Sequence, residues 1–252
     1  MNEQDFFDLL LISWFGLAGV IFVTLFFITA PYGRYTRPGW GPVIPNRAGW
    51  VLMELPAAGV FALFFFLSDR TAALLPVVFL ALWEMHYLHR SLIYPLRLRP
   101  GRKITLVTVA LGVIFNLGNT YINGRYLFTL GPEYTAAWLY DPRFIAGGLI
   151  FIAGFAVNKH SDRILRDLRG PGDSGYSVPR GGLYRWVSCP NYLGEIIEWA
   201  GWAVATWSPA GLSFLVWTAA NLVPRAWQHH RWYRTKFPDY PKERKAVIPF
   251  LL

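Results

Sequence analysis

The sequence predicts an all-α, polytopic membrane protein with about seven transmembrane helices, formed by one domain over residues 1–252. Hydrophobic residues make up 54% of the chain and charged residues only 15%, whereas soluble domains carry about 25% charged residues. Several apolar stretches approach the roughly 20 helical residues that cross a hydrocarbon core. Lys and Arg gather in alternate segments between these stretches, which is the pattern of a chain that crosses a membrane repeatedly.

The apolar stretches between polar breaks give the predicted helices. They are Phe6–Ala30, Gly49–Leu67, Ala72–Tyr94, Ile104–Ile122, Phe144–Val157, Tyr192–Trp207 and Ala210–Tyr233. The first stretch follows acidic residues instead of a basic region and has no A-x-A cleavage site, so we expect it to be a helix of the fold and not a cleaved signal peptide. The fifth and sixth stretches are short for membrane spans.

The basic residues define an orientation. Of the 24 Lys and Arg, 20 lie before the second stretch, between the third and fourth, in Lys159–Arg185 and in Arg225–Lys245. The opposite side holds only Arg70, Arg125 and Arg143. This distribution predicts an external amino terminus and a cytosolic carboxyl terminus. It also explains the net charge of +9 without a nucleic-acid partner, and we expect none.

Ionisable side chains inside the predicted spans are costly, so each suggests a functional role. The set comprises Glu54, Glu84, His86, His89, Arg90, Glu195, Glu198, Arg225 and His229, with Asn221 beside them. At about 1.5 Å per residue, Glu54 and Tyr87 both lie roughly 10 to 12 Å inside the cytosolic boundary. The two side chains can therefore share one level, and the whole polar set belongs to the cytosolic half of the spans.

Helical spacing groups these residues on common faces. The faces are Tyr87, Arg90 and Tyr94; Asn158, Asp162, Arg166 and Arg169; and Arg225, His229 and Tyr233. A pocket rich in Arg, amides and aromatic rings suits phosphates, sugar hydroxyls and flat rings, and hence a phosphorylated nucleotide. The surplus of Arg favours NADPH over NADH. Taken singly, each Arg has another reading as a topology anchor or a lipid headgroup contact.

Two common site motifs are absent from the sequence. The histidine pairs 86 and 89 or 229 and 230 lack the HExxH spacing, and with Cys189 as the single cysteine no metal site is expected. Gly181 and Gly182 do not form GxGxxG after a strand, so a Rossmann fingerprint is missing. Any nucleotide must therefore be held by the helical pocket.

Several motifs resemble those of the steroid 5-alpha-reductases, also called 3-oxo-5-alpha-steroid 4-dehydrogenases, over nearly the whole chain. They are Glu54-Leu-Pro56, His86-Tyr-Leu-His-Arg90, Asn158-Lys-His-Ser-Asp162, Gly181-Gly-Leu-Tyr184, Asn191-Tyr-Leu-Gly-Glu195-Ile-Ile-Glu-Trp199 and the segment from Arg225 to Pro249. The sequence departs from the family where Met53 stands in place of the usual Gln, and at Cys189-Pro190 before Asn191.

The resemblance implies a seven-helix fold in which NADPH enters from the cytosol and a 3-oxo-4-ene steroid lies near the second and third helices, residues 49–94. Glu54 and Tyr87 would hydrogen-bond the substrate ketone while hydride adds to the beta carbon. The cofactor would be held mainly by residues 158–240. Its expected contacts are Arg90, Arg102, Asn158, Asp162, Arg169, Tyr176, Arg180, Asn191, Glu195, Trp199, Arg225, His229 and Tyr233.

Other functions remain open at this point. The protein could be another membrane reductase that acts on a sterol, a polyprenol or an enoyl-thioester, or an isoprenylcysteine-type methyltransferase that uses S-adenosylmethionine. A non-catalytic transporter or lipid-binding protein would instead need a polar path through both leaflets. We expect a monomer in membrane lipid, in the bacterial inner membrane or the endoplasmic reticulum, with the cofactor site facing the cytosol.

Overall fold

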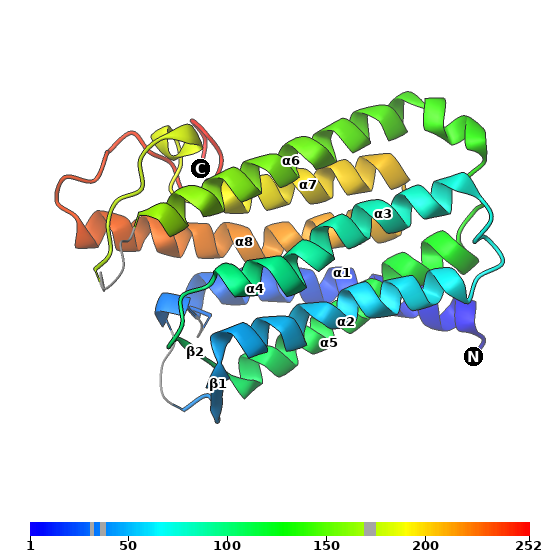
Figure 1. Cartoon of the computed structure of the whole chain (residues 1–252), viewed down its shortest axis with the longest axis horizontal. Coiled ribbons are helices and arrows are strands. Elements are labelled where there is room, and N and C mark those ends of the chain that lie inside the picture. The colour runs from blue at the N-terminus through cyan, green and yellow to red at the C-terminus, as the bar shows by residue number, and fades with distance from the viewer. Residues whose placement is uncertain (31–32, 36–38, 169–174) are drawn as a thin grey trace. The chain divides into compact units, whose positions relative to one another are not determined.

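The computed structural model describes residues 1–30, 33–35, 39–168 and 175–252, and it is mostly helical (Figure 1). The elements in chain order are α1 (Glu3–Phe27), η1 (Gly33–Tyr35), β1 (Val43–Pro45), α2 (Asn46–Phe66), α3 (Leu74–Leu88), η2 (His89–Ile93), α4 (Tyr94–Arg97), β2 (Lys103–Thr105), α5 (Leu106–Arg125), η3 (Tyr126–Leu130), η4 (Ala136–Tyr140), α6 (Pro142–Asp167), η5 (Gly182–Arg185), α7 (Pro190–Thr206) and α8 (Pro209–Lys236). Each of the seven predicted stretches therefore falls on a helix.

Four helical segments of the described chain are long and apolar enough to cross a membrane: α1, α2, Leu106–Leu130 and α6. The other predicted stretches are helical as well, but α3 and α7 have only 15 and 17 residues, and α8 ends in basic residues. The helix α6 continues ten residues beyond its predicted end at Val157, because a helix can leave the apolar layer and carry polar residues onward.

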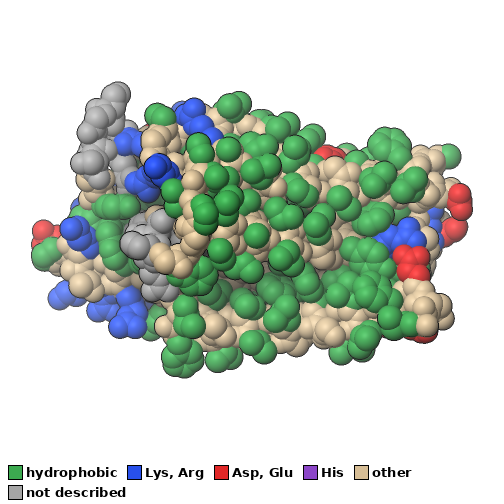
Figure 2. Space-filling view, turned by 90° about the horizontal axis from the view of Figure 1, so that it is seen from below, with side chains coloured by type: hydrophobic (Ala, Val, Ile, Leu, Met, Phe, Trp, Pro, Cys, Tyr) green, Lys and Arg blue, Asp and Glu red, His purple; other side chains and the backbone are tan. Residues whose placement is uncertain are grey.

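Hydrophobic side chains cover much of the surface visible in Figure 2, whereas charged side chains occur there in small groups. Exposed examples from α1, α2 and α6 are Ile12, Phe66 and Leu149, each about 70% accessible (71%, 70% and 69%). Water-soluble monomers rarely expose such continuous apolar surface, so these faces are suited to lipid. The protein is a membrane protein with transmembrane helices, as the low charge content predicts.

A small β-sheet, absent from the prediction, joins the starts of α2 and α5. The strands β1 and β2 pair antiparallel, with Val43 opposite Thr105 and Pro45 opposite Lys103. Thr105 also caps α5, because its hydroxyl accepts a hydrogen bond from the Thr108 amide at 3.3 Å. The expected fourth span was wrong at its start, since Ile104 belongs to β2 and α5 begins at Leu106. Three-residue strands have too little alternation to be recognised in a sequence.

The chain divides into two compact units. Unit 1 comprises Met1–Leu11 and Ala30–Asp141, and unit 2 comprises Ile12–Thr29 and Pro142–Leu252. The core of unit 1 contains Phe61 of α2 stacked on Trp83 of α3, with ring centroids 4.2 Å apart and planes 9° from parallel. The indole of Trp83 donates to the carbonyl of Ala57 at 3.1 Å. These contacts fix the rotation of α3 against α2, one turn from the candidate site.

Glycines bring α6 and α7 of unit 2 into close contact, and the two helices run side by side in Figure 1. A Cβ on Gly147 or Gly154 of α6 would overlap backbone atoms of Ala205 or Glu198, and one on Gly194 or Gly201 of α7 would overlap α6 in the same way. The spacing of seven residues in each helix repeats this contact every two turns. Small residues are the usual means of close helix packing in membranes.

Candidate active site

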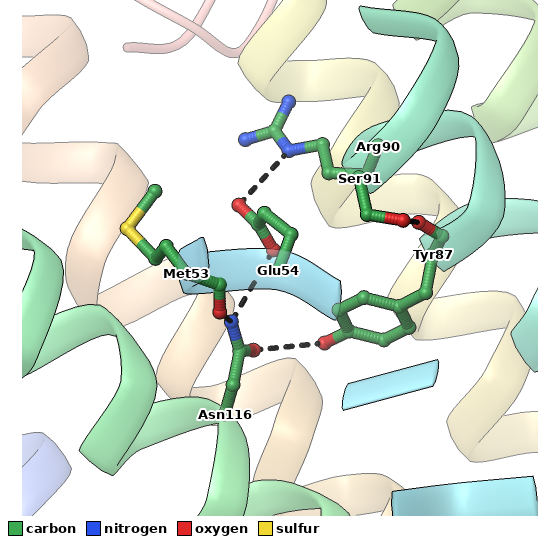
Figure 3. Close-up of polar contacts among 6 residues, drawn as sticks. All are labelled: Met53, Glu54, Tyr87, Arg90, Ser91 and Asn116. Carbon is green, nitrogen blue, oxygen red and sulfur yellow. Dashed lines mark hydrogen bonds and ion pairs between the residues drawn. The ribbon is translucent and has the colours of Figure 1, made fainter. Parts of the chain in front are cut away.

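A cluster of polar side chains in unit 1 joins three helices (Figure 3). Glu54 comes from α2, Tyr87 from α3 and Asn116 from α5. All three are buried, with 8%, 2% and 4% of their surfaces exposed. Glu54 lies eight residues into α2 and Asn116 ten residues into α5, so the sheet that pairs the helix starts also places the two side chains at similar depth.

Asn116 is the hub of this cluster. Its amide nitrogen donates to the Met53 carbonyl at 2.7 Å and to Oε2 of Glu54 at 3.3 Å. Its amide oxygen accepts a hydrogen bond from the Tyr87 hydroxyl at 3.3 Å. Asn116 was not among the residues predicted from the sequence. A weak signal was present, because two asparagines, Asn116 and Asn119, fall within one predicted span, where polar side chains are uncommon.

Arg90 lies on the other side of Glu54. Its Nε donates to Oε1 of Glu54 at 3.4 Å, and its guanidinium stands 4.6 Å above the Trp50 ring and 5.3 Å from the Tyr94 ring. Arg90 belongs to the π-helical turn η2, which follows α3 directly. Such wide turns often occur at functional sites. The ion pair partly offsets the cost of burying a carboxylate and a guanidinium among apolar helices.

Arg90 was expected to contact a cofactor, and the structure places it against the Glu54 carboxylate. Within η2, Ser91 also donates to the backbone carbonyl of Tyr87 at 2.6 Å. The predicted proximity of Glu54 and Tyr87 is confirmed, since both bind the same amide. A phenol and a carboxyl group held together in a buried apolar region can stabilise negative charge on a carbonyl oxygen.

A second polar cluster lies in unit 2, where α6 and α7 meet. The amide nitrogen of Asn158 donates to the Asn191 carbonyl at 2.8 Å, and the Asn191 side chain donates to Oδ1 of Asp162 at 3.1 Å. The close approach of Gly194 to the backbone of Asn158 makes these contacts possible. Oδ1 of Asn158 is buried and has no hydrogen-bond partner among the described residues.

The residues Arg225 and His229 of α8 meet at a tyrosine of α7. Arg225 donates to the Tyr192 hydroxyl at 2.8 Å, and this hydroxyl lies 3.2 Å from Nε2 of His229. The guanidinium also stands 5.0 Å from the centre of the Tyr192 ring. The predicted common face of Arg225 and His229 is therefore confirmed. Tyr192 was missed, although it follows Asn191 directly within a recognised motif.

The remaining predicted cofactor residues occupy varied environments. Trp199 is buried with its ring centroid 3.8 Å from that of Phe214, and Tyr233 stacks on Tyr240 at 5.3 Å. Tyr176 packs edge-to-face on Trp232. Glu195 is half-buried on α7, Arg102 and Arg180 are exposed, and Arg169 lies outside the described residues.

A buried network ties the carboxyl-terminal segment to α8. Ser188 Oγ lies 2.7 Å from Nδ1 of His230 and 2.6 Å from the Tyr240 hydroxyl, and it donates to the Lys245 carbonyl at 3.1 Å. Burial raises the pKa of Tyr240, so its phenol stays protonated and can donate to Ser188. Nearby, Arg244 is buried, and its Nε and Nη1 have no hydrogen-bond partner in the described part of the chain.

Comparison with known proteins decides the family. Residues 102–252 match the sequence model of the family described as 3-oxo-5-alpha-steroid 4-dehydrogenase. The chain belongs to this family. It is 42% identical to the steroid 5-alpha-reductase DET2 of Gossypium hirsutum, with 99% of each protein covered. It is also 41% identical to 3-oxo-5-alpha-steroid 4-dehydrogenase 1 of Bos taurus, with 100% of this chain and 99% of the relative covered.

The family membership confirms the resemblance predicted from the motifs. The steroid 5-alpha-reductase family consists of oxidoreductases that act on carbon–carbon double bonds, so this chain is an enzyme of that class. The finding favours a reductase over the methyltransferase and transporter alternatives. The similarity to the family extends to residues 1–101, which the family model leaves out, because the two relatives align over essentially the whole chain.

Proposed function

We propose that the protein uses NADPH to reduce the 4,5 double bond of 3-oxo-4-ene steroids, or of a similar enone lipid. The observation that carries this proposal is the buried cluster of Glu54, Tyr87 and Asn116 in a member of the 3-oxo-5-alpha-steroid 4-dehydrogenase family. Reduction of a ketone-conjugated double bond places negative charge on the ketone oxygen, and a hydrogen-bond donor there stabilises it. This cluster offers a phenol and a carboxyl group for that purpose.

The proposed chemistry is conjugate reduction. NADPH, when bound, supplies a hydride to the beta carbon of the enone. As the double bond accepts this hydride, its electrons move toward the ketone oxygen. Tyr87 stabilises the developing enolate by donating a hydrogen bond to that oxygen, and the Glu54 carboxyl group donates a second one in its protonated form. A proton then adds to the alpha carbon, which restores the ketone and completes the saturation of the double bond.

The residues of unit 2 are chemically suited to the cofactor. Oδ1 of Asn158 is a buried acceptor without a hydrogen-bond partner among the described residues, and Arg244 has two such donor atoms. Buried polar groups are normally satisfied, so a ligand with amide, hydroxyl and phosphate groups accounts for both. Arg225, Tyr192 and His229 add charge and an aromatic face. The guanidinium groups support the 2′-phosphate of NADPH over NADH.

The membrane arrangement is part of the proposal. We propose that all seven predicted stretches cross the membrane, with the amino terminus outside and the basic cofactor residues on the cytosolic side. The short helices α3 and α7 would then be sheltered by neighbouring protein. The membrane would be the bacterial inner membrane or the endoplasmic reticulum according to the source, and the active form a monomer.

The deciding experiment measures NADPH consumption by the purified protein in detergent with progesterone or testosterone, with NADH in parallel. A product that gains two hydrogens by mass spectrometry, formed with NADPH, supports the reaction. A reaction without the protein serves as the control for non-enzymatic loss of NADPH. Absence of both turnover and NADPH binding would reject the proposal, and S-adenosylmethionine binding would then be tested.

The residue at position 53 bears on whether the substrate is a steroid or another enone lipid. The proposed contacts recognise only the enone end of the substrate, and Met53 stands where the family usually has Gln. The Met53 side chain packs against Gly112 of α5, beside the cluster. A panel of enones with different ring systems, compared by kcat/KM, distinguishes a steroid reductase from an enzyme for another enone lipid.

A further inference from the structure

The orientation of the Asn116 amide is determined by its surroundings. Its nitrogen lies 2.7 Å from the Met53 carbonyl oxygen, which can only accept a hydrogen bond. A flipped amide would place two oxygens against each other at that distance, so the NH₂ group must face Met53. The amide oxygen must then face Tyr87, and the Tyr87 hydroxyl must be the donor.

The three hydrogen bonds of Asn116 differ in length. The bond to the Met53 carbonyl is short, whereas those to Oε2 of Glu54 and from the Tyr87 hydroxyl both measure 3.3 Å. Hydrogen bonds from hydroxyl groups in proteins are usually about 2.7 to 2.8 Å long. The backbone contact therefore anchors the amide, and the long contact from the Tyr87 hydroxyl can be exchanged readily for a contact with a ligand.

We propose that Asn116 is a positioning residue for Glu54 and Tyr87, an inference that rests on the reductase function proposed above. Asn116 keeps the phenol and the carboxyl group on either side of one amide, with the Tyr87 proton directed toward that amide. When a ketone oxygen arrives, the hydroxyl rotates from Asn116 to the ketone, while the anchored amide still holds Glu54. The residue acts through its neighbours and does not bond the substrate itself.

A purely structural role is the alternative, and α5 supplies the control. Asn123 is also fully buried on α5, and its side chain donates to the carbonyl of Asn119 at 3.1 Å and to the Asn119 side chain at 3.2 Å. These contacts stay within α5 and involve neither Glu54 nor Tyr87. Asn123→Leu and Asn116→Leu therefore remove the same side chain from the same helix, but only the second changes the cluster.

The test compares kcat, KM and NADPH affinity of these variants with an enone that the wild type reduces. We expect Asn116→Leu to lower kcat about 10- to 100-fold with NADPH affinity unchanged, and Asn123→Leu to keep kcat within about 3-fold. In a Tyr87→Phe background, Asn116→Leu should add less than about 3-fold, because residues that act as a unit are not additive. Full kcat in Asn116→Leu, or an undiminished effect in the Tyr87→Phe background, would overturn the inference.

The isosteric variant Asn116→Asp tests the same point without a cavity. Its carboxylate can still accept from Tyr87 but cannot donate to Met53 or Glu54, and it adds a charge beside Glu54, Tyr87 and Arg90. We expect low kcat at neutral pH and partial recovery toward acidic pH, where the introduced carboxyl group becomes protonated and can donate again. A flat pH profile relative to wild type contradicts the inference. A wild type that reduces no enone instead rejects the proposed function, and this inference with it.

Discussion

Two buried asparagines, one in each unit, use their amides differently. Asn116 in unit 1 bonds protein groups with both its nitrogen and its oxygen. Among the described residues, the Asn158 side chain in unit 2 donates to the Asn191 carbonyl, and its amide oxygen has no hydrogen-bond partner there. The amide of Asn116 is thus fully hydrogen-bonded by protein groups, whereas the oxygen of Asn158 can still accept a hydrogen bond from a ligand. We therefore expect changes in unit 1 to alter turnover, and changes in unit 2 to alter cofactor affinity.

The largest effect should come from removing the proposed catalytic groups. Tyr87→Phe removes the phenol donor, and Glu54→Gln replaces the proton-carrying carboxyl group by an amide that is a weaker donor. Neither change leaves a cavity, so we expect kcat to fall about 100- to 1,000-fold. NADPH affinity, measured by titration of nucleotide fluorescence, should stay within about 2-fold of wild type. If either variant turned over at the wild-type rate, the assignment of these two residues as catalytic would be wrong.

The glycine contact in unit 2 should be nearly as sensitive. A leucine at Gly154 would collide with the backbone of α7 at Glu198, and overpacking of this kind costs about 1 to 3 kcal/mol, sometimes more. Separation of α6 from α7 also disturbs Asn158 and Asn191, so NADPH affinity should fall together with the thermal midpoint in detergent. Gly148→Leu is the matched control, because no atom lies within 4 Å of a Cβ at that position.

Unchanged thermal stability of Gly154→Leu would mean that α6 and α7 do not pack as closely as the structure indicates. Equal destabilisation by Gly148→Leu would instead point to loss of helix or membrane fit, unrelated to the contact with α7.

An intermediate effect is expected at Asn158. Asn158→Leu removes the buried amide oxygen that is available to a ligand, and it also frees the Asn191 carbonyl. We expect NADPH affinity to weaken about 10- to 30-fold, as when one buried hydrogen bond is lost, while kcat at saturating NADPH changes less than about 3-fold. Asn116→Leu should give the opposite pattern. A common pattern in the two variants would remove the distinction drawn between the two units.

Much of the helical fold follows from the sequence because membrane helices are long and uniformly apolar. The run from Phe6 to Ala30 is an example, and α1 covers most of it. Helix ends were less predictable. The helix α6 continues through Asn158 and Asp162, where Asn191 of α7 hydrogen-bonds both residues, and hydropathy carries no information about such contacts. The strands β1 and β2 depend on pairing between residues about 60 positions apart, which local patterns do not report.

Site residues could be predicted where an ionisable side chain stands inside an apolar span. They could not be predicted where their role depends on tertiary contacts. Glu54 and Tyr87 were identified from depth and motif, and in the structure both hydrogen-bond Asn116. Asn116 was missed because an asparagine carries no charge, and its importance comes from facing Met53 and Tyr87 across two helices. Trp199 shows the reverse case. Its place in a motif suggested a cofactor contact, which stays a prediction, whereas the packing of its ring against Phe214 is determined only by the tertiary structure.

The smallest effect that still separates the two units is expected at Tyr192. Its hydroxyl receives a hydrogen bond from Arg225 and lies next to His229, so Tyr192→Phe leaves both side chains less well held while the ring contact remains. We expect NADPH affinity to fall about 3- to 10-fold, in keeping with the roughly 0.5 to 1.5 kcal/mol of a typical hydrogen bond, with kcat unchanged at saturating cofactor. Tyr121→Phe is the matched control, because that hydroxyl bonds Glu3 in unit 1 at 3.3 Å. If Tyr121→Phe also lost NADPH affinity, the loss would reflect general destabilisation and not the contact with Arg225 and His229. The roles of Arg225 and His229 would then have to be tested by substituting each of them.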